Sequence, residues 1–250
     1  MIPLRTPAEI DAIARAGAIL AGLFTAIEPR VVPGASTADL DRFAEGFIRG
    51  HDHAEPSFKG LYGFPATLCT SINEEVVHGI PSRKRRLKEG DLVSIDAGVR
   101  LDGWCADRAV TFPVGAIDAP THRLLAVTRE SLEAGIAEAR PGNRIGDIGA
   151  AIQELAEAAG MSVVRELVGH GVGRLPHEKP EVPNFGRRGT GLRLLAGLVL
   201  AIEPMVNQGE RDILTLADEW TVVTADRSRS AHFEHTVAVT PNGPRILTLA

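Results

Sequence analysis

Four acidic residues lie in or beside apolar segments that have the pattern of β-strands. Asp96 follows Leu-Val-Ser-Ile, Glu203 follows Val-Leu-Ala-Ile, and Asp107 and Glu234 stand in similar settings further along the chain. A buried charge is costly unless it is paired or bound to a metal. Four gathered carboxylates would repel one another, whereas two divalent cations about 3.5–4 Å apart would make them bridging ligands, as in two-metal hydrolases. The set therefore indicates a hydrolytic metal centre, although any one of these acids alone could be a cap or a salt-bridge partner.

A histidine is available to complete this ligand set. His170 stands in Gly169–Gly173, Gly-His-Gly-Val-Gly, where the absence of neighbouring side chains allows close approach to its ring. Imidazole is a common ligand of borderline divalent metals.

The spacing of the first two acids can be tested against hairpin geometry. With Asp102-Gly103 as a two-residue turn, Asp96 lies opposite Ala109, and Asp107 lies on the same face as a diagonal neighbour. Diagonal Cβ atoms lie about 7 Å apart, so both carboxylates can reach one ion. A slip of one residue would put them on opposite faces.

Helices and strands that could position these residues are readable around them. Thr6-Pro7-Ala8-Glu9 has the form of a capping box with proline at the first helical position, and Pro29 ends the helix that follows. The periodic spacing of apolar residues, together with turn-forming residues, predicts three further helices and four strands. They are a helix from Ser36 or Thr37 to Gly50, helices Leu124–Ala139 and Ile145–Ala159, and strands Thr67–Ser71, Val76–Ile80, Leu92–Val99 and Ala109–Val114.

Two segments each have a similar copy later in the chain, at nearly the same distance in sequence. Pro33–Leu40 is similar to Pro141–Ile148, 108 positions later, and Gly90–Asp96 is similar to Gly197–Glu203, 107 positions later. Two matches in order predict a duplicated helix–helix–strand unit. Since Pro-Gly turns and glycine-led strands are common, chance similarity is the alternative. Residues 1–250 are expected to form one catalytic domain with halves at approximately 7–115 and 116–250.

Composition excludes several classes of protein. The chain of 250 residues is 44% hydrophobic and has a net charge of −5, which argues against disorder and against nucleic acid as a specific partner. Two cysteines suit a reducing compartment. The apolar runs are shorter than the roughly 20 residues of a membrane helix, and the N-terminus lacks the apolar core of a secretory signal. A cytoplasmic protein without a membrane partner is expected.

Five motifs resemble those of type I methionine aminopeptidases, in the family's order and spacing. They are Asn73–Pro81 with its His-Gly-Ile-Pro, Ser94–Asp96 with Asp107, Gly169–Gly173 with His177, Ile202–Met205, and Phe233–Thr236. The resemblance implies an α+β pita-bread fold, in which pseudo-two-fold halves, each a helix–helix–strand unit, surround a central antiparallel β-sheet. It also implies an enzyme that removes the N-terminal methionine from nascent proteins and peptides when the second residue is small.

The resemblance assigns roles to individual residues. It implies that two divalent metal ions (Co, Mn, Fe, Zn or Ni) are held by Asp96, Asp107, His170, Glu203 and Glu234. Glu203 also matches the carboxylate that moves a proton. His78 and His177 match the two histidines that are not ligands and that hydrogen-bond the scissile amide. The remaining histidines are expected to have no role in the site; they are His51, His53, His122, His232 and His235.

The methionine pocket follows from the same resemblance, with departures. Phe64, Cys69 and Trp220 match positions that line it. Leu61 stands where the family usually has tyrosine, and Pro176 stands where it often has an aromatic residue. Arg108 replaces the small polar residue usual after the second metal aspartate.

Other functions fit less well. Xaa-Pro peptidases of the same superfamily usually carry an extra N-terminal domain, and type II aminopeptidases carry an insertion where only 25 residues separate His177 from Glu203. A metal-free binding module would have lost the ligands that are intact here. The expected partners are peptides with N-terminal methionine and nascent chains, and the protein is expected to be a monomer. The basic run Arg83–Lys88 is either a solvated loop or a site of transient ribosome contact.

Overall fold

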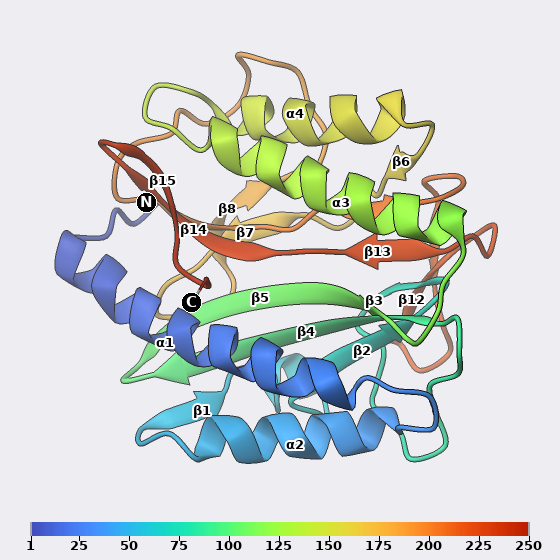
Figure 1. Ribbon diagram of the computed structural model, residues 1–250. Coiled ribbons are helices and arrows are strands. Elements are labelled where there is room, and N and C mark those ends of the chain that lie inside the picture. Colours follow the sequence, from blue (N-terminus) through green and yellow to red (C-terminus); the bar gives the residue numbers. More distant parts are fainter. Residues whose placement is uncertain (1, 250) are drawn as a thin grey trace.

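Two antiparallel sheets lie between two pairs of helices in the computed structural model (Figure 1). Helices α1 (Pro7–Ile27) and α2 (Thr37–Arg49) cover one outer side, and α3 (Ala119–Glu138) and α4 (Ile145–Ala158) cover the other. The structure describes residues 2–249. Residues 1 and 250, the ends of the expected catalytic domain, lie outside this part.

The first sheet is built around the long hairpin of β4 (Leu92–Leu101) and β5 (Trp104–Pro113). The other edge of β4 pairs with β2 (Leu68–Ile72) and then with β1 (Ala54–Pro56). As expected for a turn at Asp102-Gly103, Asp96 lies opposite Ala109.

The second sheet and two small sheets complete the fold. The second sheet has the order β15 (Gly243–Ile246), β14 (His235–Thr240), β9 (Val199–Ile202), β7 (Gly169–Gly171), β8 (Glu178–Val182). One small sheet comprises β13 (Ser230–His232), β10 (Met205–Asn207) and β6 (Ser162–Val163), and the other comprises β11 (Ile213–Thr215), β12 (Val222–Thr224) and β3 (Glu75–Val77). Short 3₁₀ turns occupy Glu28–Arg30 and Leu61–Gly63.

The two large sheets are joined where β5 meets the segment that leads into β14. The amide of Glu234 donates to the carbonyl of Ala109 at 2.9 Å. The hydroxyl of Thr236 accepts from the Asp107 amide at 2.9 Å and donates to the Asp107 carbonyl at 2.8 Å. These hydrogen bonds form the seam between the two large sheets. They bring Asp107 of β5 and Glu234, which directly precedes β14, to the same place.

The sequence placed most elements correctly and misjudged three boundaries by three or more residues. Strand β5 begins at Trp104 rather than at Ala109, because the hairpin pairing continues up to the Asp102-Gly103 turn. The capping box of Thr6 and Glu9 begins α1. Helix α3 begins at Ala119 rather than Leu124, because the carboxylate of Asp118 caps it by accepting from the Thr121 amide at 2.9 Å. The expected strand Val76–Ile80 ends at Val77, where the backbone turns away.

The two repeated segments make the same contacts. The Gly34 amide donates to the Leu87 carbonyl at 2.8 Å, and the Gly142 amide donates to the Leu194 carbonyl at 3.1 Å. Both glycines have positive φ, 89° and 97°, which suits a residue without a Cβ. Each turn leads into a helix, α2 or α4.

Helix α1 is a core helix. The segment from Pro7 to Arg30 is long and apolar enough to cross a membrane by length and composition, which the uninterrupted apolar runs did not suggest. Its apolar face is instead buried with β4 and β5, including Ile13 and Leu20, which have no exposed surface. At Gly17 the helix leaves no room for a Cβ, because the carbonyl of Leu247 lies there. The C-terminal segment is therefore packed directly on the first helix.

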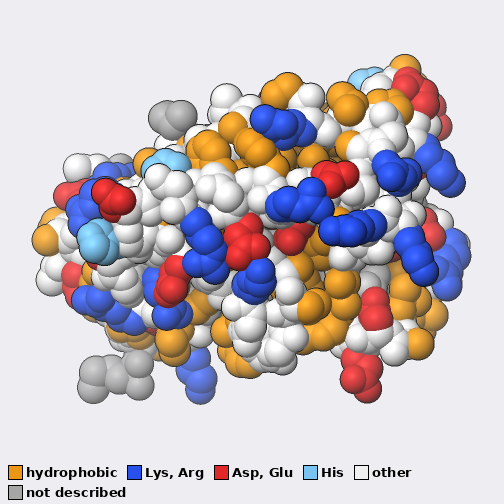
Figure 2. Space-filling model, turned by 90° about the horizontal axis from the view of Figure 1, so that it is seen from below, with side chains coloured by type: hydrophobic (Ala, Val, Ile, Leu, Met, Phe, Trp, Pro, Cys, Tyr) orange, Lys and Arg blue, Asp and Glu red, His pale blue; other side chains and the backbone are white. Residues whose placement is uncertain are grey.

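The side of the molecule beyond α2 is charged. Figure 2 shows basic and acidic side chains interspersed on this face, with small apolar areas between them. On α2 itself, Arg42 pairs with Asp39 at 2.9 Å and Arg49 pairs with Glu45 at 3.1 Å. A mixed surface of this kind is well hydrated.

Candidate metal centre

The acids predicted from the sequence converge on one site and form two adjacent groups. In the first group, single carboxylate oxygens of Asp96, Asp107 and Glu234 all lie within 4.8 Å of one another. In the second, ligand atoms of His170, Glu203 and Glu234 meet the same limit. Glu234 belongs to both groups, so the two groups share a carboxylate.

The seam between the sheets creates this arrangement. Asp96 and Asp107 come from the β4–β5 hairpin, Glu203 follows the last residue of β9, and Glu234 stands between β13 and β14. His170 is the central residue of β7. Each sheet thus contributes part of the set, and neither sheet holds it alone.

The glycines around His170 serve a different purpose from the one expected. A Cβ on Gly169 would collide with the carbonyl of Ala201 on β9, and a Cβ on Gly171 would collide with the carbonyl of Lys179 on β8. The glycines allow β7 to lie close against its neighbours, which fixes the strand that carries the imidazole.

The donor atoms fit divalent cations. One carboxylate oxygen of each of Asp96, Asp107 and Glu234 is buried without a hydrogen-bond partner among the described residues. Buried polar atoms are almost always satisfied by protein, water or an ion. Three unsatisfied carboxylate oxygens pointing into one site, beside an imidazole, form a donor set suited to such cations.

The raised pKa values of the four acids also indicate a site for positive charge. Burial raises the pKa of Asp96 and that of Glu203 to about 7, and neighbouring groups modify both values. Burial, reinforced by the other carboxylates, raises the pKa values of Asp107 and Glu234 well above their usual range. Positive charge at the site would offset both causes.

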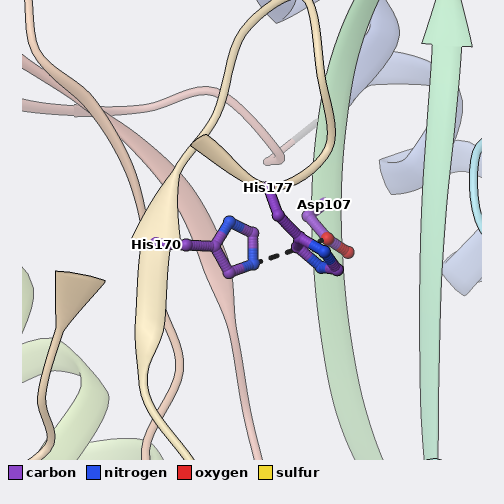
Figure 3. Close-up of side chains that lie close together, drawn as sticks. All are labelled: Asp107, His170 and His177. Atoms are coloured by element: carbon purple, nitrogen blue, oxygen red, sulfur yellow. Dashed lines mark ion pairs between the residues drawn. The ribbon is translucent and has the colours of Figure 1, made fainter. Parts of the chain in front are cut away.

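The imidazole of His170 is oriented toward the acids. Its Nδ1 lies 3.0 Å from the carbonyl of Gly171, which leaves Nε2 facing the site. Nε2 lies 3.3 Å from Oε1 of Glu203. It lies 4.0 Å from Oδ2 of Asp107, which Figure 3 shows beside it. Burial lowers the pKa of His170, so the ring is kept neutral, as a ligand requires.

His177 lies directly beside His170. The ring centroids are 4.4 Å apart and the planes are nearly perpendicular, and Figure 3 shows both rings with Asp107. A ring nitrogen of His177 also lies within 4.8 Å of ligand atoms of His170 and Asp107. His78 also lines the cavity and has its ring edge-on to Trp220, with centroids 6.4 Å apart.

The site opens into a cavity of about 360 Å³ that contains the expected pocket residues. Phe64 and Trp220 pack edge to face with centroids 5.1 Å apart. Cys69 lies on β2 directly opposite Asp96, and burial keeps its thiol protonated by raising its pKa. The walls are therefore largely apolar and include a sulfur atom.

Leu61 and Pro176, the two departures from the family pattern at the pocket, have different outcomes. Leu61 lines the cavity, as the tyrosine that it replaces was expected to do. Pro176 is buried and is not among the described residues that line the cavity. An aromatic ring is supplied nearby by Tyr62, which stacks on His177 with centroids 6.0 Å apart and is 76% exposed.

His232, which was expected to have no role, lies in the cavity. It is 1% exposed, and its Nε2 lies 3.5 Å from Oε2 of Glu203. That nitrogen has no hydrogen-bond partner within residues 2–249. The usable sequence signal was its position two residues before Glu234, in a segment whose sequence resembles one strand, where residues i and i+2 would share a face; in the structure the strand is interrupted at Phe233 and Glu234. The other four histidines without an assigned role are not among the described residues that line the cavity.

Arg108 is a structural residue. Its Nη1 donates to the carbonyl of Thr248 at 2.9 Å, and its guanidinium lies 5.0 Å from the ring centre of Phe24. It points away from Asp107, its neighbour in the strand, and joins β5 to α1 and the C-terminal segment.

Comparison with known proteins agrees with the geometry. The family model for metallopeptidase family M24 matches residues 11–241. The chain is 55% identical over 249 residues to a methionine aminopeptidase of Clostridium perfringens, covering 100% of this chain and 99% of that one. It is 46% identical over 248 residues to the methionine aminopeptidase of Escherichia coli strain K12, covering 99% and 94%.

Solved structures give the same result. The methionine aminopeptidase of Thermotoga maritima superposes with a TM-score of 0.98 at 44% identity, with both chains fully covered. The prolidase of Pyrococcus furiosus superposes with a TM-score of 0.77 at 22% identity, covering 99% of this chain and 65% of that one, and so shares the fold. The expected α+β pita-bread fold is confirmed.

Proposed function

The chain belongs to metallopeptidase family M24; it is a methionine aminopeptidase, which removes N-terminal methionine, and we propose that it acts with two divalent cations at the paired acidic groups. The observation that carries this proposal is that the two groups share Glu234 at the end of an apolar cavity. The substrates are peptides and nascent proteins with an N-terminal methionine followed by a small residue.

The ligands divide between the two cations. Asp96, Asp107 and Glu234 would hold one, and His170, Glu203 and Glu234 the other, with Asp107 close to both. When bound, such cations supply Lewis acidity, which activates water and polarises a peptide carbonyl. Co, Mn, Fe, Zn and Ni are all compatible with carboxylate and imidazole ligands.

The remaining steps belong to side chains of this protein. Glu203 accepts the proton of the attacking water at a carboxylate oxygen and passes it to the departing amine. His78 and His177 donate hydrogen bonds to the scissile amide and stabilise the negative charge that develops there. Burial lowers the pKa of His78 to about 4, so its ring is a neutral donor across the working pH range.

The cavity selects the substrate. Phe64, Cys69 and Trp220 offer aromatic and sulfur contacts to an unbranched thioether, and Leu61 extends the apolar wall. Methionine fits such a pocket because its side chain is flexible and polarisable. Tyr62 and His177 stack at the opening and limit the space for the second residue.

The cellular setting follows from the substrate. We assign the enzyme to the cytoplasm, as a monomer that meets nascent chains and contacts the ribosome only transiently. Within residues 2–249 both cysteines are free, which suits a reducing compartment. We interpret the repeated turns as marks of two related halves, 7–115 and 116–250, that share one site.

Peptide assays with a metal titration test this function. We expect release of methionine from a Met-Ala peptide that requires added divalent metal and saturates at two equivalents. An Xaa-Pro peptidase would instead cleave an Ala-Pro peptide, and a binding module would cleave neither. Cleavage of the Ala-Pro peptide at a comparable rate, or saturation at one equivalent, would contradict the proposal.

A further inference from the structure

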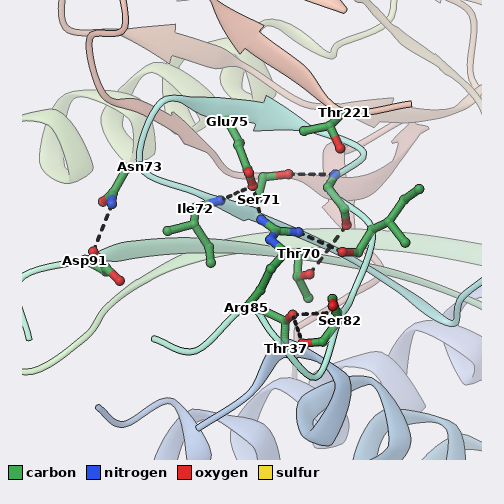
Figure 4. A network of polar contacts seen from close by, with 12 residues as sticks. Thr37, Thr70, Ser71, Ile72, Asn73, Glu75, Ser82, Arg85, Asp91 and Thr221 are labelled. Atoms are coloured by element: carbon green, nitrogen blue, oxygen red, sulfur yellow. Dashed lines mark hydrogen bonds and ion pairs between the residues drawn. The ribbon is translucent and has the colours of Figure 1, made fainter. Parts of the chain in front are cut away.

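Arg85 is part of the basic run that was predicted to be a solvated loop or a ribosome-facing patch, but its side chain turns inward. The guanidinium forms an ion pair with Glu75 and donates through Nη1 to the carbonyl of Ile80 at 2.8 Å (Figure 4). The two paired side chains are only 24% and 18% exposed. Arg83, two positions earlier, is exposed.

The loop that Arg85 contacts begins at a strained residue. His78 has φ of 60°, a left-handed conformation that a residue with a Cβ seldom adopts. Such a conformation persists only where the surrounding structure imposes it. The direction in which the His78 ring enters the cavity depends on this backbone.

Contacts from the β2–β3 region hold the residue after His78. The Gly79 amide donates to the Ser71 hydroxyl at 3.2 Å, and the Gly79 carbonyl accepts from the Thr70 amide at 2.8 Å. A Cβ on Gly79 would collide with the Thr70 carbonyl and press on the carboxylate of Glu75. Glu75 itself accepts from a backbone amide of the same turn, that of Ile72, at 2.7 Å.

The backbone of Arg85 is anchored to a different element. Its carbonyl accepts from the Thr37 amide at the start of α2 at 2.9 Å. The Thr37 hydroxyl in turn accepts from the Ser82 amide at 2.9 Å (Figure 4). Arg85 therefore connects three parts of the protein: its backbone is bonded to the start of α2, and its guanidinium contacts the start of β3 and the loop that follows His78.

We propose that Arg85, through its ion pair with Glu75 and its bond to the Ile80 carbonyl, is a positioning residue that holds His78 in its left-handed conformation and aims its ring into the cavity. This inference rests on the proposed role of His78 at the scissile amide. Lysine could reach only one of the two acceptors, because the planar fork of arginine is what contacts both at once.

Kinetics of Arg85→Ala and of the matched control Arg83→Ala provide the first test. We expect Arg85→Ala to lower kcat about 10- to 100-fold with little change in KM, because a misplaced group can cost up to about 10²-fold in rate. Arg85→Lys is expected to recover part of kcat, and Arg83→Ala to match the unmodified enzyme. Unchanged kcat in Arg85→Ala would overturn the proposal.

A double-mutant cycle separates positioning from a general loss of structure. In a His78→Ala background, Arg85→Ala should have little further effect on kcat, since both changes remove the same interaction. An equal loss of kcat in both backgrounds would refute the inference. If Arg85→Ala does not fold, Glu75→Gln keeps the size of the partner and removes its charge, and the same cycle applies.

A spectroscopic measurement makes the test independent of activity. In protein labelled with ¹⁵N-histidine, the ring resonances of His78, assigned from His78→Ala, should move in Arg85→Ala and stay in place in Arg83→Ala. If the ring resonances of His78 do not move in Arg85→Ala, the proposal that Arg85 positions the ring is wrong. If His78→Ala itself keeps full kcat, the role of His78 in the proposed function fails, while the spectra still decide whether Arg85 positions the ring.

Discussion

The Nε2 atom of His232 lies 3.5 Å from Oε2 of Glu203, while the other oxygen of the same carboxylate lies 3.3 Å from Nε2 of His170. Glu203 thus lies between two imidazoles. His232 therefore faces one oxygen of the carboxylate that we propose moves the proton, and His170 faces the other.

Replacement of His232 tests this contact. His232→Ala should lower kcat about tenfold or more, because Glu203 loses the group that limits its orientation. Bound metal, measured by elemental analysis, should stay at the level of the unmodified protein. His122→Ala, an exposed substitution on α3, is the control. A normal kcat in His232→Ala would show that the contact is not used.

Glu203→Gln should preserve the fold and remove most turnover. The amide keeps the size of the side chain but cannot accept a proton, and general acid–base catalysis contributes about 10²–10⁴-fold. Circular dichroism should be unchanged, with kcat reduced by at least about 10²-fold. Glu130→Gln, at an exposed position, should be neutral. The proposed proton transfer is wrong if Glu203→Gln keeps kcat near that of the unmodified enzyme.

Chelation should abolish activity and lower the melting temperature together. Removal of cations leaves four buried carboxylates to repel one another, and the native state loses the stabilisation that ligand binding gave it. Added Mn²⁺ or Co²⁺ should restore both properties, as followed by peptide release and differential scanning calorimetry. Full activity after exhaustive chelation would rule out the metal mechanism.

The pKa of His78 predicts a pH dependence of stability. Burial lowers this pKa from 6.5 to about 4, so the unfolded chain takes up the proton before the folded protein does. Stability is therefore lost as the pH falls from about 6.5 to about 4, by about 3 kcal/mol at 1.36 kcal/mol per pKa unit. His78→Gln should lose less stability over that range. Urea unfolding of both chelated proteins at several pH values measures the difference, and equal losses would contradict the prediction.

The size of the residue that follows methionine in the substrate provides another test. Met-Ala peptides should be cleaved much faster than Met-Leu peptides, because Tyr62 and His177 narrow the opening. Comparable rates for Met-Ala and Met-Leu would contradict the proposed specificity.

Trp220→Ala should raise KM for Met-Ala, since it removes one wall of the methionine pocket.

The first half of the site could be predicted because its geometry is local. A two-residue turn fixes the hairpin register, and the two-residue period of a strand then puts Asp96 and Asp107 on one face. The strand-like setting of Glu234 marked it as a candidate, but its position beside Asp107 could not be derived from local geometry, because that position depends on a seam between distant strands. That seam includes the hydrogen bond from the Glu234 amide to the Ala109 carbonyl.

Arg85 shows what a local pattern could not predict. It stands among other basic residues, and no periodicity distinguishes the one that turns inward. Its orientation depends on Glu75 and on the carbonyl of Ile80, which only the folded loop presents. His232 was overlooked for a related reason: a single histidine in an apolar strand has the composition of ordinary core.

The bonds between Asp107 and Thr236 join residues that are 129 positions apart, and they bear on the order of events during synthesis. Domains form as the chain emerges from the ribosome at about 5–20 residues per second. The β4–β5 hairpin is complete long before Glu203 and Glu234 exist. A nascent chain that has reached only the hairpin holds two of the four acids and lacks both its later strands and the segment that packs against Gly17. The site can therefore assemble only after the segment that contains Glu234 and Thr236 has been synthesised.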